Sequence, residues 1–155
     1  MTAQSDVTEG SGFVSDYLLY LLAAASDGAS AQFHAQVRKA GLRVPEWRVL
    51  ACLHDRDGEM ITQLARFALV EQSRLTRIII QMEERGLVLR QSDPKDGRRV
   101  RVFMTPQGRT LPQQQVTQAK AQEASLLARL SAEDAARLKP ILHALLDAVE
   151  EDPSP

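Results

Sequence analysis

Five side chains with strong hydrogen-bonding groups lie close together in one short stretch of the chain. They are Gln72, Ser73, Arg74, Thr76 and Arg77. Arginine can donate two parallel hydrogen bonds to guanine, glutamine can pair similarly with adenine, and a hydroxyl suits a base or a phosphate. Apolar residues recur through the same stretch at helical spacing, so the polar groups share one exposed edge of a helix. Such a helix fits the DNA major groove, with Thr76 as a candidate phosphate contact.

A basic segment with a different period follows. Val100, Val102 and Met104 alternate with Arg99, Arg101 and Phe103, which is the pattern of a strand with one buried face. The preceding Pro94–Gly97 segment has turn composition. The hairpin presents Lys95, Asp96, Arg98, Arg99 and Arg101 as candidate contacts, and Asp96 is placed to orient Arg98 by a charge-assisted hydrogen bond. A basic hairpin beside a groove-binding helix can reach the minor groove or the backbone of DNA.

Short elements around these residues are predicted to position them. A helix over residues 61–67 and a second helix over residues 71–85 flank a turn, and Leu75, Ile78, Ile79 and Met82 of the second helix face the core. A two-residue strand is predicted at residues 59–60. The sequence therefore predicts a mainly α fold with a small β-hairpin, arranged as a winged helix-turn-helix.

Long amphipathic helices are predicted on both sides of this unit. The first covers residues 13–40 and ends at Gly41, with its apolar stripe interrupted at residues 26–28, where a kink is expected, and another covers residues 46–55. Beyond the hairpin, Thr105 and Pro106 begin a long helix, and Ser131 begins the last one. Pro112 predicts a bend near Leu111 or a late helix start, and Pro140 a bend in the last helix.

These elements divide the chain into five parts. They are a flexible tail (1–12), an N-terminal dimerisation and linker helix (13–45), the winged helix-turn-helix (46–105), C-terminal dimerisation helices (106–150) and a second tail (151–155).

Charge is unevenly distributed along the 155 residues. Residues 66–109 carry ten Arg/Lys and five Asp/Glu, giving +5, whereas the remainder carries nine and fifteen, giving −6, for a net charge of −1. A basic centre between acidic ends is expected of a nucleic-acid contact region. The sequence has no membrane-spanning apolar run, we expect no secretory signal, and its single cysteine, Cys52, is predicted to be a buried core residue. We expect a cytoplasmic protein.

Two segments together resemble the MarR (multiple antibiotic resistance regulator) family of bacterial transcription factors. They are LARFALVEQSRLTRIIIQMEERGLV and, after a short gap, SDPKDGRRVRVFMTPQGR. The resemblance implies a dimer that binds DNA and is paired through the first helix and the last two. It also implies that Glu71 to Arg77 form the DNA-reading turn, and that Asp96 and Arg98 take the roles of the wing's Asp-x-Arg pair.

The sequence departs from the family pattern at the helix-turn-helix turn. Leu69 stands where a glycine commonly makes that turn. A leucine at positive φ is costly, so we expect a different turn geometry here. Pro112 and Pro140 also lie in helices that the family keeps long.

The resemblance further implies a small aromatic or phenolic effector that binds between the dimer helices and the DNA-binding lobe. Phe33, Trp47, Arg48 and His54 are the candidates to line that cleft, and each also fits ordinary packing. The three histidines and Cys52 show no metal-ligand spacing, and no nucleophile–base pattern or phosphate loop occurs. We therefore expect no metal, no cofactor and no catalysis.

Taken together, the sequence predicts a homodimeric transcription regulator, a repressor that binds a palindromic double-stranded DNA operator and is released by its effector. Two alternatives remain: an architectural DNA-binding protein with no ligand, and a winged-helix module that binds other proteins. The basic centre argues against the second.

Overall fold

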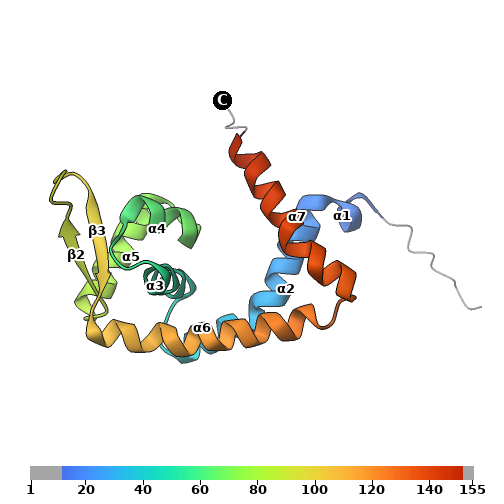
Figure 1. Ribbon diagram of the computed structural model, residues 1–155, viewed down its shortest axis with the longest axis horizontal. Helices are drawn as coiled ribbons and strands as arrows, with labels where there is room; N and C mark the ends of the chain where they lie inside the picture. The colour runs from blue at the N-terminus through green and yellow to red at the C-terminus, as the bar shows by residue number, and fades with distance from the viewer. Residues whose placement is uncertain (1–11, 152–155) are drawn as a thin grey trace, which may run out of the picture.

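The structure, a computed structural model, describes residues 12–151. Seven helices and three short strands lie within this range (Figure 1). In chain order they are α1 (Phe13–Asp16), α2 (Leu18–Lys39), α3 (Val44–Asp55), β1 (Glu59–Met60), α4 (Ile61–Ala68), α5 (Gln72–Glu84), β2 (Val88–Ser92), β3 (Val100–Met104), α6 (Pro106–Leu127) and α7 (Ala132–Glu151). The two predicted tails, 1–12 and 151–155, fall almost entirely outside the described residues.

The helices and strands form two groups (Figure 1). Helices α3, α4 and α5 gather against the sheet in one lobe, while α1, α2 and α7 gather in an arm, and α6 runs along both. The chain is mostly helical with one small antiparallel sheet, so the predicted fold class, a winged helix-turn-helix, is confirmed. Within residues 12–151, no helix combines the length and apolar character needed to cross a lipid bilayer.

The sheet has the order β1-β3-β2 and is antiparallel throughout. In the hairpin, Val88 pairs with Met104 and Ser92 with Val100, while Glu59 of the predicted two-residue strand pairs with Val102. Val102 and Met104 are buried, as the alternation predicts. The hairpin is thereby fixed to the lobe by one face, which leaves its turn free to project.

The core of the lobe forms where α3, α4, α5, the sheet and the C-terminal part of α2 meet. Its fully buried side chains are mostly branched aliphatic residues: Val37, Val49, Leu50, Leu64, Leu75, Ile79, Met82, Val88 and Val102. Burying one such side chain contributes about 1.5–3 kcal/mol, so the four inward residues of α5 hold that helix on the lobe. These four residues of α5, Leu75, Ile78, Ile79 and Met82, are all buried, as predicted.

The first predicted helix is broken at one position near its start. Tyr17, with φ −79° and ψ 123°, separates α1 from α2, whereas α2 continues through Gly28 without a break. A glycine inside a helix costs only about 1 kcal/mol, and the Ser30 hydroxyl donates to the Ser26 carbonyl at 2.7 Å across this turn. A helix of 22 residues tolerates that cost. Gly41, with φ 83°, ends the helix as predicted.

Neither internal proline interrupts its helix. The late start expected for α6 is wrong, because α6 begins at Pro106, where the Thr105 hydroxyl accepts a hydrogen bond from the Gly108 N–H at 3.0 Å. Pro112 is buried within this helix. Likewise, α7 is continuous through Pro140, and the Ser131 hydroxyl accepts from the Asp134 N–H at 3.1 Å at its start.

The turn between α4 and α5 contradicts the sequence prediction. Leu69 does adopt the left-handed conformation, with φ 58° and ψ 41°. The N–H groups of Leu69 and Val70 donate to the carbonyls of Arg66 and Ala65 at 3.3 and 3.2 Å, which is a common way to end a helix. Arg48 also donates to the Ala68 carbonyl at 3.1 Å. These bonds offset the conformational cost, and the Leu69 side chain avoids clashes because it is 75% exposed.

The strain at Leu69 can be tested by substitution. Asparagine tolerates the left-handed region and a β-branched residue does not, so L69N should be more stable than L69V by about 1 kcal/mol. Urea unfolding followed by circular dichroism measures this difference. Equal midpoints for the two variants would show that the turn carries no such strain.

Candidate nucleic-acid interface

Helix α5 presents its polar edge to solvent. Glu71 precedes it in extended conformation, and Gln72, Ser73, Arg74 and Arg77 are exposed on the side opposite the buried apolar residues. Thr76 is half-buried, and its hydroxyl donates to the Gln72 carbonyl at 3.0 Å. The helix thus carries donors and acceptors on a rigid surface, as recognition of base edges requires.

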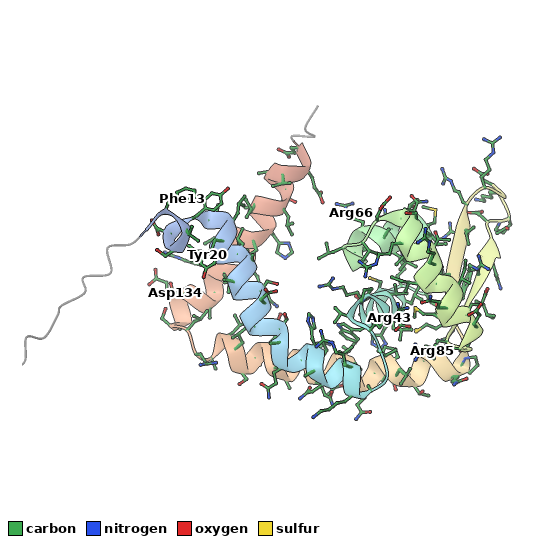
Figure 2. All side chains as sticks on the ribbon, turned by 180° about the vertical axis from the view of Figure 1, so that it is seen from behind. Phe13, Tyr20, Arg43, Arg66, Arg85 and Asp134 are labelled. Atoms are coloured by element: carbon green, nitrogen blue, oxygen red, sulfur yellow. The ribbon has the colours of Figure 1, made fainter. Side chains whose placement is uncertain are left out.

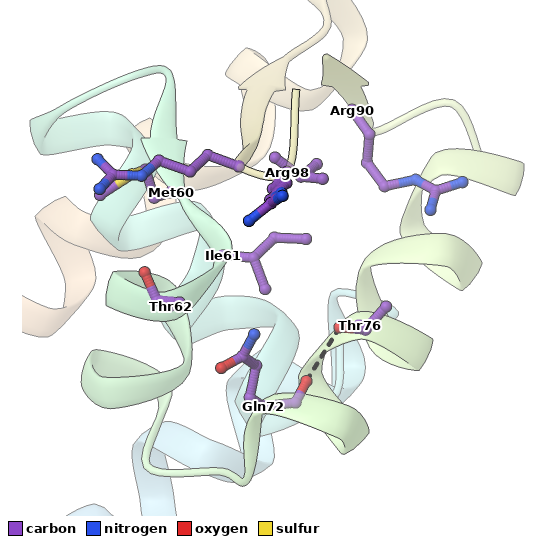
Figure 3. A pocket seen from close by; sticks show the side chains of 9 residues that line it. Met60, Ile61, Thr62, Gln72, Thr76, Arg90 and Arg98 are labelled. Carbon is purple, nitrogen blue, oxygen red and sulfur yellow. Dashed lines mark hydrogen bonds between the residues drawn. The ribbon is translucent and has the colours of Figure 1, made fainter. Parts of the chain in front are cut away.

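A hollow joins this edge to the wing, which is the β2–β3 hairpin and its turn (Figure 3). It has a volume of about 400 Å³ and is lined by residues of β1, α4, α5 and the wing: Met60, Ile61, Thr62, Gln72, Thr76, Arg90, Arg98, Arg99 and Val100. The structure therefore brings together four of the side chains singled out in the sequence, namely Gln72 and Thr76 from the helix and Arg98 and Arg99 from the wing. Their positive charge and hydrogen-bonding groups suit the phosphates and edges of a nucleic acid.

Backbone hydrogen bonds shape the tip of the wing. The Asp96 carboxylate accepts from the backbone N–H of Arg98 at 3.0 Å, and its other oxygen lies 3.7 Å from Nε of Arg99. The sequence predicts that Asp96 orients the Arg98 side chain. In the structure, Asp96 instead accepts a hydrogen bond from the Arg98 backbone. Arg98 is exposed and has no ion pair within residues 12–151, so its guanidinium is available to a ligand.

Arg101 anchors the base of the wing. Its Nε donates to the Asp93 carboxylate at 3.2 Å, and its Nη1 donates to the Gly58 carbonyl at 3.0 Å. Asp93 also accepts from the backbone N–H of Lys95 at 2.9 Å. The Lys95 N–H and then the Arg101 guanidinium lower the pKa of the Asp93 carboxyl. Although Arg101 was predicted as a direct contact, two of its donors are used inside the lobe.

Arg90 is a candidate contact that the sequence analysis missed. It lies on β2 and borders the hollow, and it is held by the Glu83 carboxylate at 3.1 and 3.0 Å from Nε and Nη2. The Arg90 backbone N–H, together with this guanidinium, lowers the pKa of Glu83. The pairing of Arg90 with Val102 fixes its place in the wing, and that register could not be read from the basic pattern of β3 alone.

The four candidate effector residues do not converge on one hollow. The rings of Phe33 and Trp47 meet edge to face with centroids 5.2 Å apart. Arg48 is directed to the Ala68 carbonyl, and His54 instead borders a separate open hollow of about 710 Å³ beside α6. Phe33 also lines a hollow of about 270 Å³ between α2 and α6.

Cys52 is half-buried against the lobe core, close to the fully buried position predicted for it. Burial, and secondarily the charge of Asp55, raises the pKa of its thiol to about 11. The thiol is therefore protonated at neutral pH and a poor nucleophile. Among the described residues, no cluster of three or more histidine, cysteine or carboxylate side chains could hold a metal ion.

Comparison with known proteins identifies relatives of one kind. Residues 42–100 match the model of the MarR family. The HTH-type transcriptional repressor Rv2887 of Mycobacterium tuberculosis is 30% identical over 129 residues, covering 83% of this chain and 91% of that protein. The HTH-type transcriptional repressor IacR of Pseudomonas putida is 32% identical over 93 residues, which cover 60% of this chain and 56% of IacR.

Solved structures give the same result. The MarR family transcriptional regulator SPO1453 from Silicibacter pomeroyi is 56% identical, with a TM-score of 0.81 over 89% of this chain and 98% of that one. Rv2887 in complex with salicylic acid is 29% identical, with a TM-score of 0.64 over 83% of this chain and 95% of that one.

The anchoring of the wing by Asp93 should depend on pH. Because its pKa is lowered in the folded protein, the ionised carboxylate stabilises the wing above its ordinary pKa, and this contribution is lost as the pH falls through the folded pKa. The protection factors of the amides in residues 93–101, which correct the exchange rates for their intrinsic pH dependence, should therefore fall in acid in the parent protein. D93N should have low protection factors in this segment already at neutral pH and should lack the acid step. An identical acid step in D93N would contradict the role of Asp93.

Proposed function

Because the chain belongs to the MarR family of transcription regulators, we propose that it acts as a homodimeric repressor on a palindromic DNA operator and is released by a small aromatic or phenolic acid. The observation that carries the proposal is the shared hollow, where the exposed edge of α5 and the arginines of the wing face the same space (Figure 3). This arrangement suits a duplex that is read in its major groove and gripped at its backbone.

The proposed contacts divide by role. Gln72, Ser73, Arg74 and Arg77 read base edges, while Thr76 contacts a phosphate. Lys95, Arg98 and Arg99 of the wing contact the backbone or the minor groove, with Arg90 at the edge of the same surface. Asp96 and Arg101 act by holding the wing in shape, as their internal bonds indicate.

Dimerisation is supported by apolar surface on the arm. Phe13 of α1 is 77% exposed and Val149 of α7 is 64% exposed. Further exposed apolar side chains of these helices and of α2 are Val14, Leu18, Leu19, Leu21, Ile141 and Leu146. The arm lies at the opposite end of the molecule from the wing (Figures 1 and 2), so a second copy can cover it while both wings remain free. We propose this pairing through α1, α2 and α7, with half-sites about one helical turn of DNA apart.

The effector is proposed from a relative and from one feature of this chain. Rv2887 has been solved with salicylic acid. Here, Phe33 contributes an aromatic side chain to a hollow between α2 and α6, and Trp47 packs against it. An aromatic acid bound in this hollow would change the packing of the arm against the lobe. We further propose that the protein acts in the cytoplasm, where its DNA target lies, and that it catalyses no reaction.

DNA binding is tested by separating base readout from backbone grip. R74A should lose about 1–3 kcal/mol at one base position of a selected operator, which changes the sequence preference. R98A should weaken binding to most sequences and lower the slope of log K against log salt by about 1. Gel shifts on an operator selected from random duplex DNA measure both effects, with K39A on α2 as the control. If both variants bound like K39A, the assignment of this surface would be wrong.

Effector release is tested with salicylate and a matched non-aromatic acid, cyclohexanecarboxylate. Salicylate should weaken operator binding about 5- to 150-fold, the usual range for coupled sites. Cyclohexanecarboxylate should have a much smaller effect because it cannot stack on Phe33. Fluorescence anisotropy of labelled operator gives the affinities. The absence of release by either acid would favour the architectural protein with no ligand.

A further inference from the structure

One carboxylate is fully buried where three helices meet. Glu46, in the first turn of α3, is 1% exposed. Its Oε1 accepts from the backbone N–H and the Nε of Arg43 at 2.9 and 3.1 Å, and its Oε2 accepts from Nη1 of Arg85 at 2.7 Å. Both oxygens are therefore satisfied by charge-assisted bonds. A buried ion pair seldom adds net stability, so the effect of these contacts on the positions of the helices is the property to explain.

The two arginines extend this contact to helix ends on either side. Arg85 follows the last turn of α5, and its Nη2 donates to the Gly41 carbonyl, where α2 ends, at 2.8 Å. Nη2 of Arg43 donates to Oε1 of Gln81 in α5 at 2.5 Å. Figure 2 shows Arg43 and Arg85 within the lobe. The Glu46 cluster, comprising Arg43, Glu46, Gln81 and Arg85, thus links α2, α3 and α5.

We propose that Glu46 is a positioning residue that sets the angle between α5 and α2, and thereby the half-site spacing that the dimer accepts. This inference rests on the proposed function. Since α2 runs from the arm into the lobe core, where its Phe33 and Val37 are buried, and α5 is proposed to read DNA, any rotation at their junction would move the two recognition helices relative to each other. Helix α5 has 13 residues and is about 20 Å long. A rotation of about 10° at its C-terminal end would displace its N-terminal end by about 3.4 Å, the rise of one base pair.

The glutamine variant removes the charge and keeps the shape. E46Q leaves a neutral amide in place of the carboxylate that holds two guanidinium groups, which loosens the junction. The probe is an operator selected by the parent protein from random duplex DNA, together with versions whose half-sites are one base pair closer or further apart. The parent should lose at least about tenfold in affinity when the spacing changes. E46Q should lose less than about threefold across the series, with unchanged half-site sequence.

Two further variants keep the test decisive. E123Q breaks an exposed ion pair between α6 and α7, in which Nζ of Lys139 lies 2.7 Å from the carboxylate, and it should retain the spacing penalty of the parent. R85K keeps the charge but loses the forked contact to Glu46 and Gly41, so it should partly reduce the loss of affinity caused by altered spacing. If E46Q does not fold, R85K takes its place in the test of the role of Glu46.

The outcomes separate the two proposals. If the parent selects no DNA, the proposed function fails. If the parent selects DNA and the folded E46Q, or R85K in its place, keeps the full spacing penalty, the role of Glu46 is overturned while the proposed function stands. A parent that binds all spacings equally would also overturn the role of Glu46.

Discussion

The burial of one face of α5 is the constraint on which the rest of this structure depends. Leu75, Ile78, Ile79 and Met82 fill the core between α3, α4 and the sheet, and this burial fixes which edge of α5 remains in solvent. The same core receives Val102 of the wing, so the helix edge and the hairpin are positioned by one set of contacts. Loss of that packing would separate the two parts of the proposed DNA surface even if every polar side chain were retained.

Around this core, the charged residues divide into those that reach outward and those used internally. Arg98 remains exposed at the wing tip, whereas Arg101 is bound to Asp93 and the Gly58 carbonyl. Arg85 is committed to Glu46 and Gly41. A count of basic residues along the sequence therefore overstates how many can contact DNA, because an arginine whose hydrogen-bond donors are used inside the lobe mainly holds the local structure in place.

The turn at Leu69 illustrates how tertiary contacts override a local preference. Leucine disfavours positive φ, and on that basis the sequence predicted another geometry. The closing hydrogen bonds of α4 and the donation from Arg48 on α3 nevertheless hold the left-handed conformation. The uninterrupted paths of α2 through Gly28 and of α7 through Pro140 have a different explanation, because a long helix can offset one unfavourable residue.

The sequence by itself determined the fold class, the inward and outward edges of α5, the hairpin and the family, because periodicity and turn composition are local properties of the chain. Only the tertiary structure decided which distant side chains meet. It placed Arg90 at the edge of the hollow, dispersed Phe33, Arg48 and His54 to different surroundings, and joined Glu46 to Arg85. Contacts of this kind depend on how helices and strands pack, and residues far apart along the chain leave no periodic signal of their meeting.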